Sequence, residues 1–119
     1  MILNIICTQK MNKLLQELLK TLGVGGIHSC GKIDFNVPEI FKLDSIKSFD
    51  LGQSNLNDID LIYSVAREKK IPLLRLRPGK DELLSGNIQK RFPTGVSLVY
   101  EAGLFDEAKQ VVKSYRSLK

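Results

Sequence analysis

The sequence predicts a single α/β domain over residues 1–119, with a mainly parallel sheet of five strands between two layers of helices, as in flavodoxin-like or Rossmann-like folds. Short apolar runs alternate with segments of helical periodicity along the chain, which is the pattern of strand–helix crossovers. With 43% hydrophobic and 26% charged residues, the composition is that of an ordinary folded domain. At 119 residues the chain is too short for a closed eight-stranded barrel of about 250 residues, so an open half of such a barrel is the alternative fold.

The first predicted unit is a strand at residues 2–7 followed by an amphipathic helix. The strand is apolar and rich in β-branched side chains, as expected for a strand buried on both faces. Thr8 can cap the helix and Gly23 can end it. One stripe of the helix is apolar: Met11, Leu14, Leu15, Leu18, Leu19 and Leu22. The apolar run at residues 1–7 is too short for a signal peptide or a membrane span, which predicts a cytoplasmic protein that does not contact a membrane.

The middle of the chain predicts two further units. A strand through residues 24–28 leads to a Cys30-Gly31 turn, and Pro38 suits the first turn of a short helix at about 38–43. A strand at 45–51 is followed by a helix that begins at Asn57 or Asp58 and runs to about 70. The inner face of that helix is predicted to be Ile59, Ile62, Tyr63 and Ala66.

The last units are shorter and less regular. A strand is predicted at 73–77, followed by a short helix at 81–85 and an irregular piece broken by Gly86. A fifth strand at 96–100 precedes a final helix that begins near Phe105 and has acidic residues in its first turn. That helix is expected to bury Phe105, Ala108, Val111, Val112 and Tyr115.

The net charge of +5 is concentrated in residues 67–91, which carry eight basic and three acidic side chains. A basic cluster of this kind can mark an anion or nucleic-acid site. No aromatic residue lies within the cluster, whereas single-strand binding sites stack bases on aromatic rings. The sequence therefore argues against nucleic acid as a partner and favours a solvated charged face.

Chemistry-bearing residues gather where the predicted strands end, which is where open parallel sheets bind ligands. His28 and Cys30 end the second strand, and Cys7 ends the first, which would lie beside it in a flavodoxin-like order. An imidazole and two thiolates are suitable ligands for zinc, with an open fourth position for catalysis. Two cysteines in such a chain are typical of free thiols. The alternative is that both cysteines are small buried apolar groups and that His28 is a hydrogen-bonded histidine.

A small anionic ligand is the second predicted site, with Thr8, Lys10, Gly31, Arg75 and Arg77 as candidates. Thr8 and Lys10 lie at a helix N-terminus, which attracts anions. Arg75 and Arg77 alternate with leucines, so both are expected on one face, paired with Asp50, Glu101 or a bound anion.

Plain capping and solvent exposure are the alternatives for these residues. Cys7 before the predicted helix also invites comparison with the phosphocysteine of the IIB components of sugar phosphotransferase systems. Those loops usually supply glycine, serine or threonine, whereas Lys10-Met11-Asn12 leads directly into a leucine-rich helix here.

Residues 24–118 resemble the later part of the uroporphyrinogen decarboxylase superfamily, which includes the corrinoid-dependent methyltransferases. The likeness rests on Gly26-Ile27-His28-Ser29-Cys30-Gly31-Lys32, on Phe49-Asp50-Leu51-Gly52-Gln53 one unit later, and on the tail from Arg91-Phe92-Pro93 through the last helix. In the methyltransferases the histidine and cysteine of the His-x-Cys-Gly turn bind zinc, which activates a thiol as methyl acceptor. A further cysteine ligand comes from a glycine-rich segment near the final strand.

The chain departs from that family pattern at the final strand. Residues 96–103 contain no cysteine, so Cys7 would have to substitute from elsewhere. We therefore expect a non-catalytic or partner-dependent module with a strand-end ligand site, which associates with itself or with a complementary chain. The alternative is a zinc-thiolate methyl-transfer enzyme or subunit that uses His28 and Cys30. A phosphocysteine carrier at Cys7 is a third hypothesis.

Overall fold

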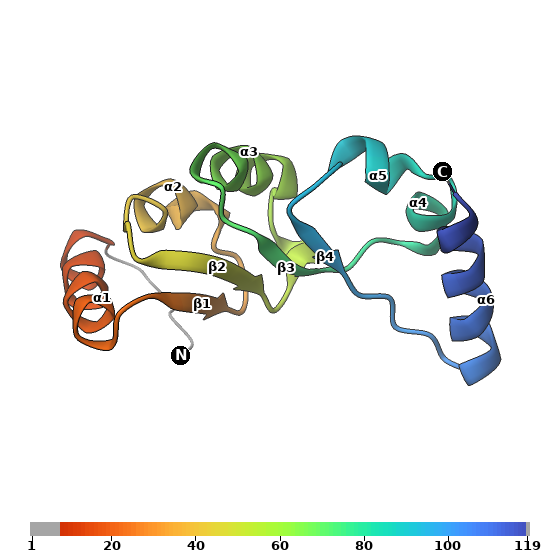
Figure 1. Ribbon diagram of the computed structural model, residues 1–119, viewed down its shortest axis with the longest axis horizontal. Helices are drawn as coiled ribbons and strands as arrows, with labels where there is room; N and C mark the ends of the chain where they lie inside the picture. The colour runs from red at the N-terminus through yellow and green to blue at the C-terminus, as the bar shows by residue number, and fades with distance from the viewer. Residues whose placement is uncertain (1–7, 119) are drawn as a thin grey trace.

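The computed structural model of the protein describes residues 8–118, with side chains from Lys13 onward, and contains one parallel sheet (Figure 1). Its strands are β1 (Gly25–Ser29), β2 (Ile46–Leu51), β3 (Leu73–Leu76) and β4 (Val96–Leu98), in the order β1-β2-β3-β4. All three neighbouring pairs are parallel. The predicted α/β class with a parallel sheet is confirmed. The described sheet has four strands rather than five, and the predicted strand at 2–7 lies outside the described residues.

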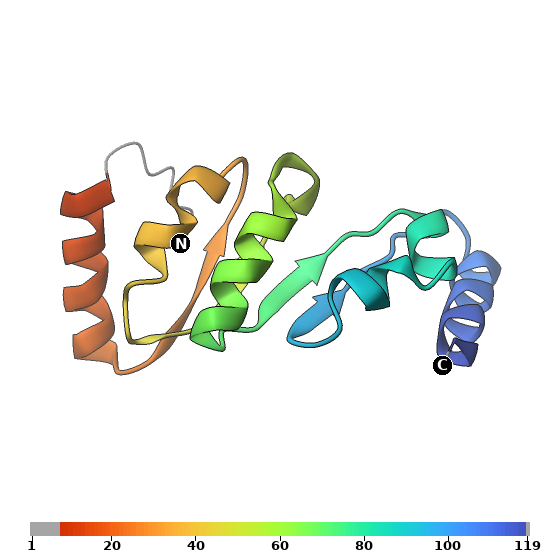
Figure 2. The ribbon, with the colours of Figure 1, turned by 90° about the horizontal axis from the view of Figure 1, so that it is seen from above.

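The helices lie mainly on one side of this sheet. Their bounds are α1 (Thr8–Leu22), α2 (Val37–Ile40), α3 (Ile59–Lys69), α4 (Lys80–Leu84), α5 (Asn87–Arg91) and α6 (Phe105–Ser117), with 3₁₀ turns η1 (Asp34–Asn36) and η2 (Ser54–Leu56). Figures 1 and 2 show α2, α3 and α5 on the same side, α1 beyond β1, and α4 and α6 beyond β4. Right-handed crossovers between strands taken in sequential order produce this one-sided arrangement. None of the described helices is long and apolar enough to cross a membrane.

The local signals in the sequence account for the helix ends. α1 stops before Gly23, whose φ of +93° is the left-handed conformation that favours glycine. The Asp58 carboxylate accepts a hydrogen bond from the backbone N–H of Leu61 at 3.1 Å and so caps α3, as predicted. Pro38 lies in the first turn of α2.

The main core lies between the sheet and the helices α2 and α3. Phe49 of β2 is fully buried and packs edge to face on Phe41, with ring centroids 5.1 Å apart. From α3, Ile62 and Ala66 are buried, while Ile59 and Tyr63 are partly buried against the core, so the predicted inner face of this helix is confirmed.

The opposite side of the sheet, which we call the open face, carries Gly26, His28, Ser48, Asp50 and Leu74. Side chains alternate along a strand and cross-strand partners share a face. Gly26 pairs with Ser48, and His28 pairs with Asp50, which in turn pairs with Leu74. No described helix lies over this face (Figures 1 and 2).

A bulge in β3 changes the predicted position of the arginines. From Leu73 to Leu76 the strand advances three residues while β4 advances two, from Val96 to Leu98. Arg75 has a φ of +62°, and its backbone N–H bonds to the hydroxyl of Ser97 at 2.9 Å. Because of the extra residue, Leu73 and Leu76 are both buried although they lie three positions apart. The prediction that leucines and arginines alternate regularly between the two faces of this strand is therefore wrong.

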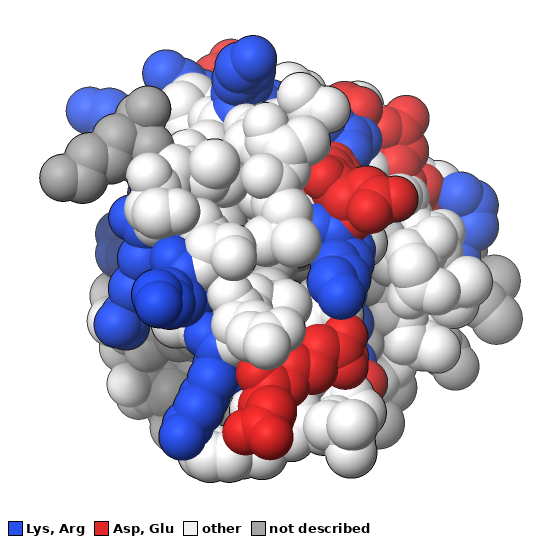
Figure 3. Space-filling model, turned by 90° about the vertical axis from the view of Figure 1, so that its right-hand side faces the viewer, with Lys and Arg blue, Asp and Glu red and all other residues white. Residues whose placement is uncertain are grey.

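The apolar stripes at the two ends of the molecule are less buried than their periodicity predicted. In α6 only Val111 is buried, and Phe105 is 74% exposed, because among the described elements nothing covers the outer side of this helix. Figure 3 shows uncharged surface between charged side chains at this end. In α1, Leu15 and Leu19 are buried and Leu14, Leu18 and Leu22 are exposed.

Candidate functional site

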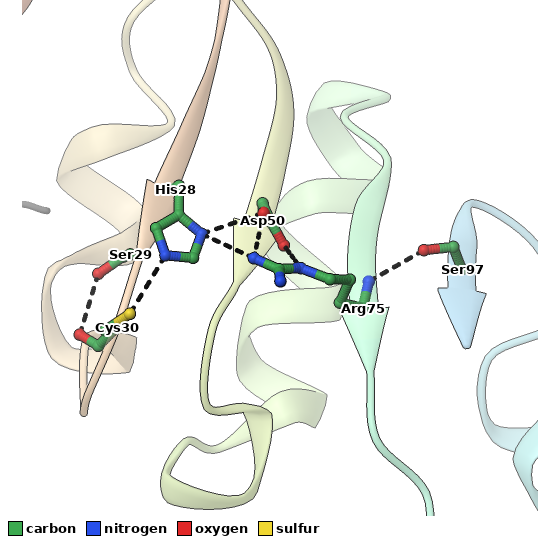
Figure 4. A network of polar contacts seen from close by, with 6 residues as sticks. All are labelled: His28, Ser29, Cys30, Asp50, Arg75 and Ser97. Carbon is green, nitrogen blue, oxygen red and sulfur yellow. Dashed lines mark hydrogen bonds and ion pairs between the residues drawn. The ribbon is translucent and has the colours of Figure 1, made fainter. Parts of the chain in front are cut away.

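The ends of β1, β2 and β3 bring together a histidine, a cysteine, a carboxylate and an arginine (Figure 4). His28 and Asp50 are direct partners in the pairing of β1 with β2. Cys30 follows β1 immediately, and the bulge in β3 brings the Arg75 side chain to the same group. Parallel pairing thus brings residues of three strands, up to 47 positions apart in the sequence, into one contiguous site.

His28 is the centre of this group because both of its ring nitrogens have partners. Nε2 lies 3.1 Å from Cys30 Sγ, and Nδ1 lies 3.0 Å from Asp50 Oδ2. In the tautomer that carries its proton on Nδ1, the ring donates to Asp50 and directs the Nε2 lone pair towards the thiol. The side chains of His28 and Asp50 are 30% and 25% exposed, and Cys30 is partly buried, so the site is open to solvent.

Arg75 holds the Asp50 carboxylate with two hydrogen bonds. Nε donates to Oδ1 and Nη2 donates to Oδ2, both at 2.6 Å. These bonds, followed by the contact with His28, hold the pKa of Asp50 below its ordinary value, although partial burial opposes the effect. Asp50 in turn raises the pKa of Arg75. The carboxylate is therefore ionised and fixed when it orients the imidazole.

A second contact of Arg75 depends on the histidine tautomer. Nη2 lies 3.0 Å from His28 Nδ1, and it can donate there only when Nδ1 carries no proton. The ring therefore has two arrangements: Nδ1 donates to Asp50, or Nδ1 accepts from Arg75 while Nε2 donates to the sulfur of Cys30. Only the first leaves Nε2 available to a metal ion.

Gly52, two residues after Asp50, makes room for the thiol and the imidazole. A Cβ atom at this position would lie 2.7 Å from Cys30 Sγ, closer than such atoms approach, and 3.2 Å from His28 Cε1, which is a tight contact. Its backbone N–H donates to the carbonyl of Ser29 at 2.8 Å, which fixes the close approach of the two strand ends. This role of Gly52 was not predicted from the sequence, although a glycine directly after a strand is a usable signal of close backbone approach.

The loop after Cys30 is bound to the loop after β2 by Asn57. Asn57 Oδ1 accepts from the backbone N–H groups of Ile33 and Asp34 at 2.7 and 3.0 Å. Its Nδ2 donates to the carbonyls of Gly31 and Gln53, both at 2.9 Å. All four hydrogen-bonding positions of the amide are used. The loop that follows Cys30 is therefore held in place by hydrogen bonds to both its carbonyl and its N–H groups.

The candidate anion residues do not form one site. The Gly31 backbone N–H already donates to Gln53 Oε1 at 2.8 Å. Arg77 pairs with Glu101 through Nη1 and donates its backbone N–H to Ser54, so it does not join the His28 group. Arg75 and Arg77 thus have the two carboxylate partners that the sequence suggested for them. Cys7 and the side chains of Thr8 and Lys10 lie outside the described part of the chain.

The donor set tests the predicted zinc site. His28 Nε2 and Cys30 Sγ are the nitrogen and sulfur donors that zinc prefers, and the carboxylate bonded to the other histidine nitrogen is the usual support for a metal-binding histidine. Within residues 8–118, however, no group of three or more His, Cys, Asp or Glu side chains could hold a metal ion. The described residues therefore supply two correctly oriented zinc ligands, but not the three or four that a zinc site needs.

Comparisons of the chain with models of protein families, with curated proteins and with solved structures found no match.

Proposed function

We propose that the protein is a partner-dependent zinc-binding module related to the later part of the uroporphyrinogen decarboxylase and corrinoid methyltransferase superfamily. In this proposal His28 and Cys30 bind the metal, and the isolated chain has no catalytic activity. The observation that carries it is the 3.1 Å contact between His28 Nε2 and Cys30 Sγ, with Nδ1 held by Asp50. Two ligands of one tetrahedral zinc ion lie about 3.5 Å apart, so only a small separation of the pair is needed.

The arrangement of the sheet supports the relation to that superfamily. The strands follow one another in sequential order, and α2, α3 and α5 share one side of the sheet (Figure 1). A doubly wound three-layer fold reverses its strand order at a switch point, which the described strands do not do. We therefore infer an open part of a barrel-type sheet rather than the flavodoxin-like sandwich. The His-x-Cys-Gly turn then ends a barrel-type strand.

A zinc-dependent methyl-transfer enzyme is the second candidate. The half-exposed position of His28 on the open face favours it, because a substrate thiol can approach there. This candidate needs a third protein ligand, for which Cys7 is the available cysteine, and it leaves the fourth position open. Bound zinc would lower the pKa of the substrate thiol and make it the methyl acceptor.

Metal content and affinity test the proposed function. We expect protein purified without chelator to contain zinc, His28→Ala to lose it, and Asp50→Asn to bind it about 10- to 100-fold more weakly because the histidine loses its ionised support. Arg77→Ala is the matched control, because Arg77 forms an ion pair with Glu101 outside the site. Zinc-free protein that also fails to bind added Zn²⁺, or His28→Ala that binds as tightly as the wild type, would contradict the proposal.

A further inference from the structure

The His28–Cys30 pair has two of the donor groups that zinc prefers, and it lies on the open face. Structural zinc sites in proteins are closed by four protein ligands, commonly two cysteines and two histidines. The described residues of one chain supply one of each. The missing ligands therefore match the present ones in number and type.

A second copy of the chain, related by a two-fold axis, would supply one more histidine and one more cysteine. In a symmetric dimer each copy presents the same surface to the other, so a residue near the axis meets its own counterpart. Two copies that approach through the open face with His28 and Cys30 near the axis would place two imidazoles and two thiolates around one point. No other residue of the chain is required.

We propose that the partner of this module is a second copy of the same chain, and that one zinc ion joins the two copies through His28 and Cys30 of each. This inference rests on the proposed zinc-binding function and names its partner. The resulting site is closed by four protein ligands, which explains a module without catalysis of its own.

The composition of the open face suits such a contact. Next to the ligands it carries Gly26, which has no side chain, and Ser48, whose side chain is small, so a second surface can approach closely. The charged groups there, Asp50 and Arg75, already neutralise each other through two hydrogen bonds. Burying these two side chains against a second copy therefore buries a paired charge rather than an isolated one, which would be costly.

The experiment measures molecular mass and zinc content together, on the wild-type chain and on Cys7→Ser. We expect light scattering to give a dimer that contains one zinc ion per two chains and becomes monomeric after a chelator removes the metal. Added Zn²⁺ should restore the dimer. Cys7→Ser should behave as the wild type, because Cys7 is not a ligand in this arrangement.

A variant on the open face tests where the copies meet. Ser48→Arg introduces a long charged side chain beside the ligands and should prevent dimer formation. Ser114→Arg adds the same group to the exposed surface of α6 and should leave the dimer intact. Circular dichroism checks that both variants are folded. If either is not, the ratio of zinc to chains in the wild-type protein decides whether one ion joins two copies.

Each failure has its own signature. A monomer with one zinc ion that is lost in Cys7→Ser overturns the bridged dimer and supports the methyl-transfer candidate. A dimer that persists without metal, or that Ser48→Arg does not affect, also overturns the bridge while leaving zinc binding intact. A chain that binds no Zn²⁺ at any concentration overturns the proposed function itself.

Discussion

The two ends of the described sheet are held together by different kinds of contact. Beyond β1 and β2, the loops at residues 30–34 and 52–58 are joined by hydrogen bonds between partly buried side chains and backbone groups. Around β3 and β4, ion pairs at the surface are prominent, such as Arg77 with Glu101 and Arg91 of α5 with Asp60 of α3. Bonds to the backbone fix the path of the chain, whereas exposed ion pairs are solvated and contribute little. The candidate site lies at the end that is fixed.

Apolar packing differs between the central core and the outer helix α6. Phe49 is fully buried between β1, β3 and Phe41, whereas Phe105 at the start of α6 is 74% exposed. The two phenylalanines have the same side chain in opposite environments. Replacing each ring in turn therefore compares the contribution of the core to stability with that of the start of α6.

Phe49→Ala is predicted to have the largest effect. It removes a fully buried ring and leaves a cavity at the centre of the core, which should lower the free energy of unfolding by about 3–5 kcal/mol. Phe105→Ala should change it by less than about 0.5 kcal/mol, because the ring is already in water. Urea denaturation of both variants measures the difference. Equal losses would show that α6 packs against the rest of the protein more closely than described.

Asn57→Ala is predicted to have the next largest effect. It leaves two backbone N–H groups and two carbonyls without their partner, and water replaces only part of those bonds, so we expect a loss of about 2 kcal/mol. Asn55→Ala, at an exposed position in the same loop, is the control and should change stability little. A loss in Asn57→Ala no larger than in the control would mean that the two loops are not joined as described.

The regular elements could be predicted from the sequence because their signals are local. Gly23, Pro38 and Asp58 mark helix ends through their own backbone or side-chain chemistry, and the structure has those ends within a few residues. The inner face of α3 followed from its periodicity in the same way. Burial of the outer residues of α6 could not be predicted, because periodicity gives an apolar face but not the element that covers it.

The candidate site could be predicted only in part. His28 and Cys30 could be identified because they lie two positions apart at the end of a predicted strand, and Asp50 because it lies near the end of a neighbouring strand. The role of Arg75 depends on a bulge with a positive φ at a non-glycine residue, which no local signal indicated. The role of Gly52 depends on an approach across strands, which a single sequence does not record.

The third prediction concerns how the stability of the fold changes in acid, and it compares the carboxylates of Asp34 and Asp60. Asp34 is 6% exposed at its side chain, and the backbone N–H of Asp58, followed by Lys32, holds its pKa below 3.8 despite the opposing effect of burial. A lowered pKa in the folded state stabilises the fold above the unfolded value of 3.8, and this contribution disappears as the pH falls through the folded value. Asp34→Asn should therefore be less stable than wild type at neutral pH and approach it in acid.

The measurement is urea denaturation of wild type and Asp34→Asn across that pH range. Asp60→Asn is the comparison, because the Asp60 side chain is 63% exposed although Arg91 also lowers its pKa. Its difference from wild type at neutral pH should be smaller, since solvent screens the pair. A constant difference for Asp34→Asn at every pH would show that its charge has no part in the effect.

The Asp60–Arg91 pair is the smallest expected contribution and the sharpest test of the contrast between the regions. Arg91 binds both carboxylate oxygens of Asp60, at 2.8 and 2.7 Å, and contacts Glu82 at 3.0 Å, so its geometry is as good as that of Arg75 with Asp50. The Asp60 side chain is nevertheless 63% exposed and that of Arg91 42%, and a pair exposed to solvent contributes about 0–1 kcal/mol and less as salt is added. A double-mutant cycle with Asp60→Asn and Arg91→Gln, measured at low and high salt, gives the coupling energy directly. A coupling well above that range that salt does not reduce would mean that the ion pairs beyond β3 and β4 also fix the chain, and the division between the two ends of the sheet would then fail.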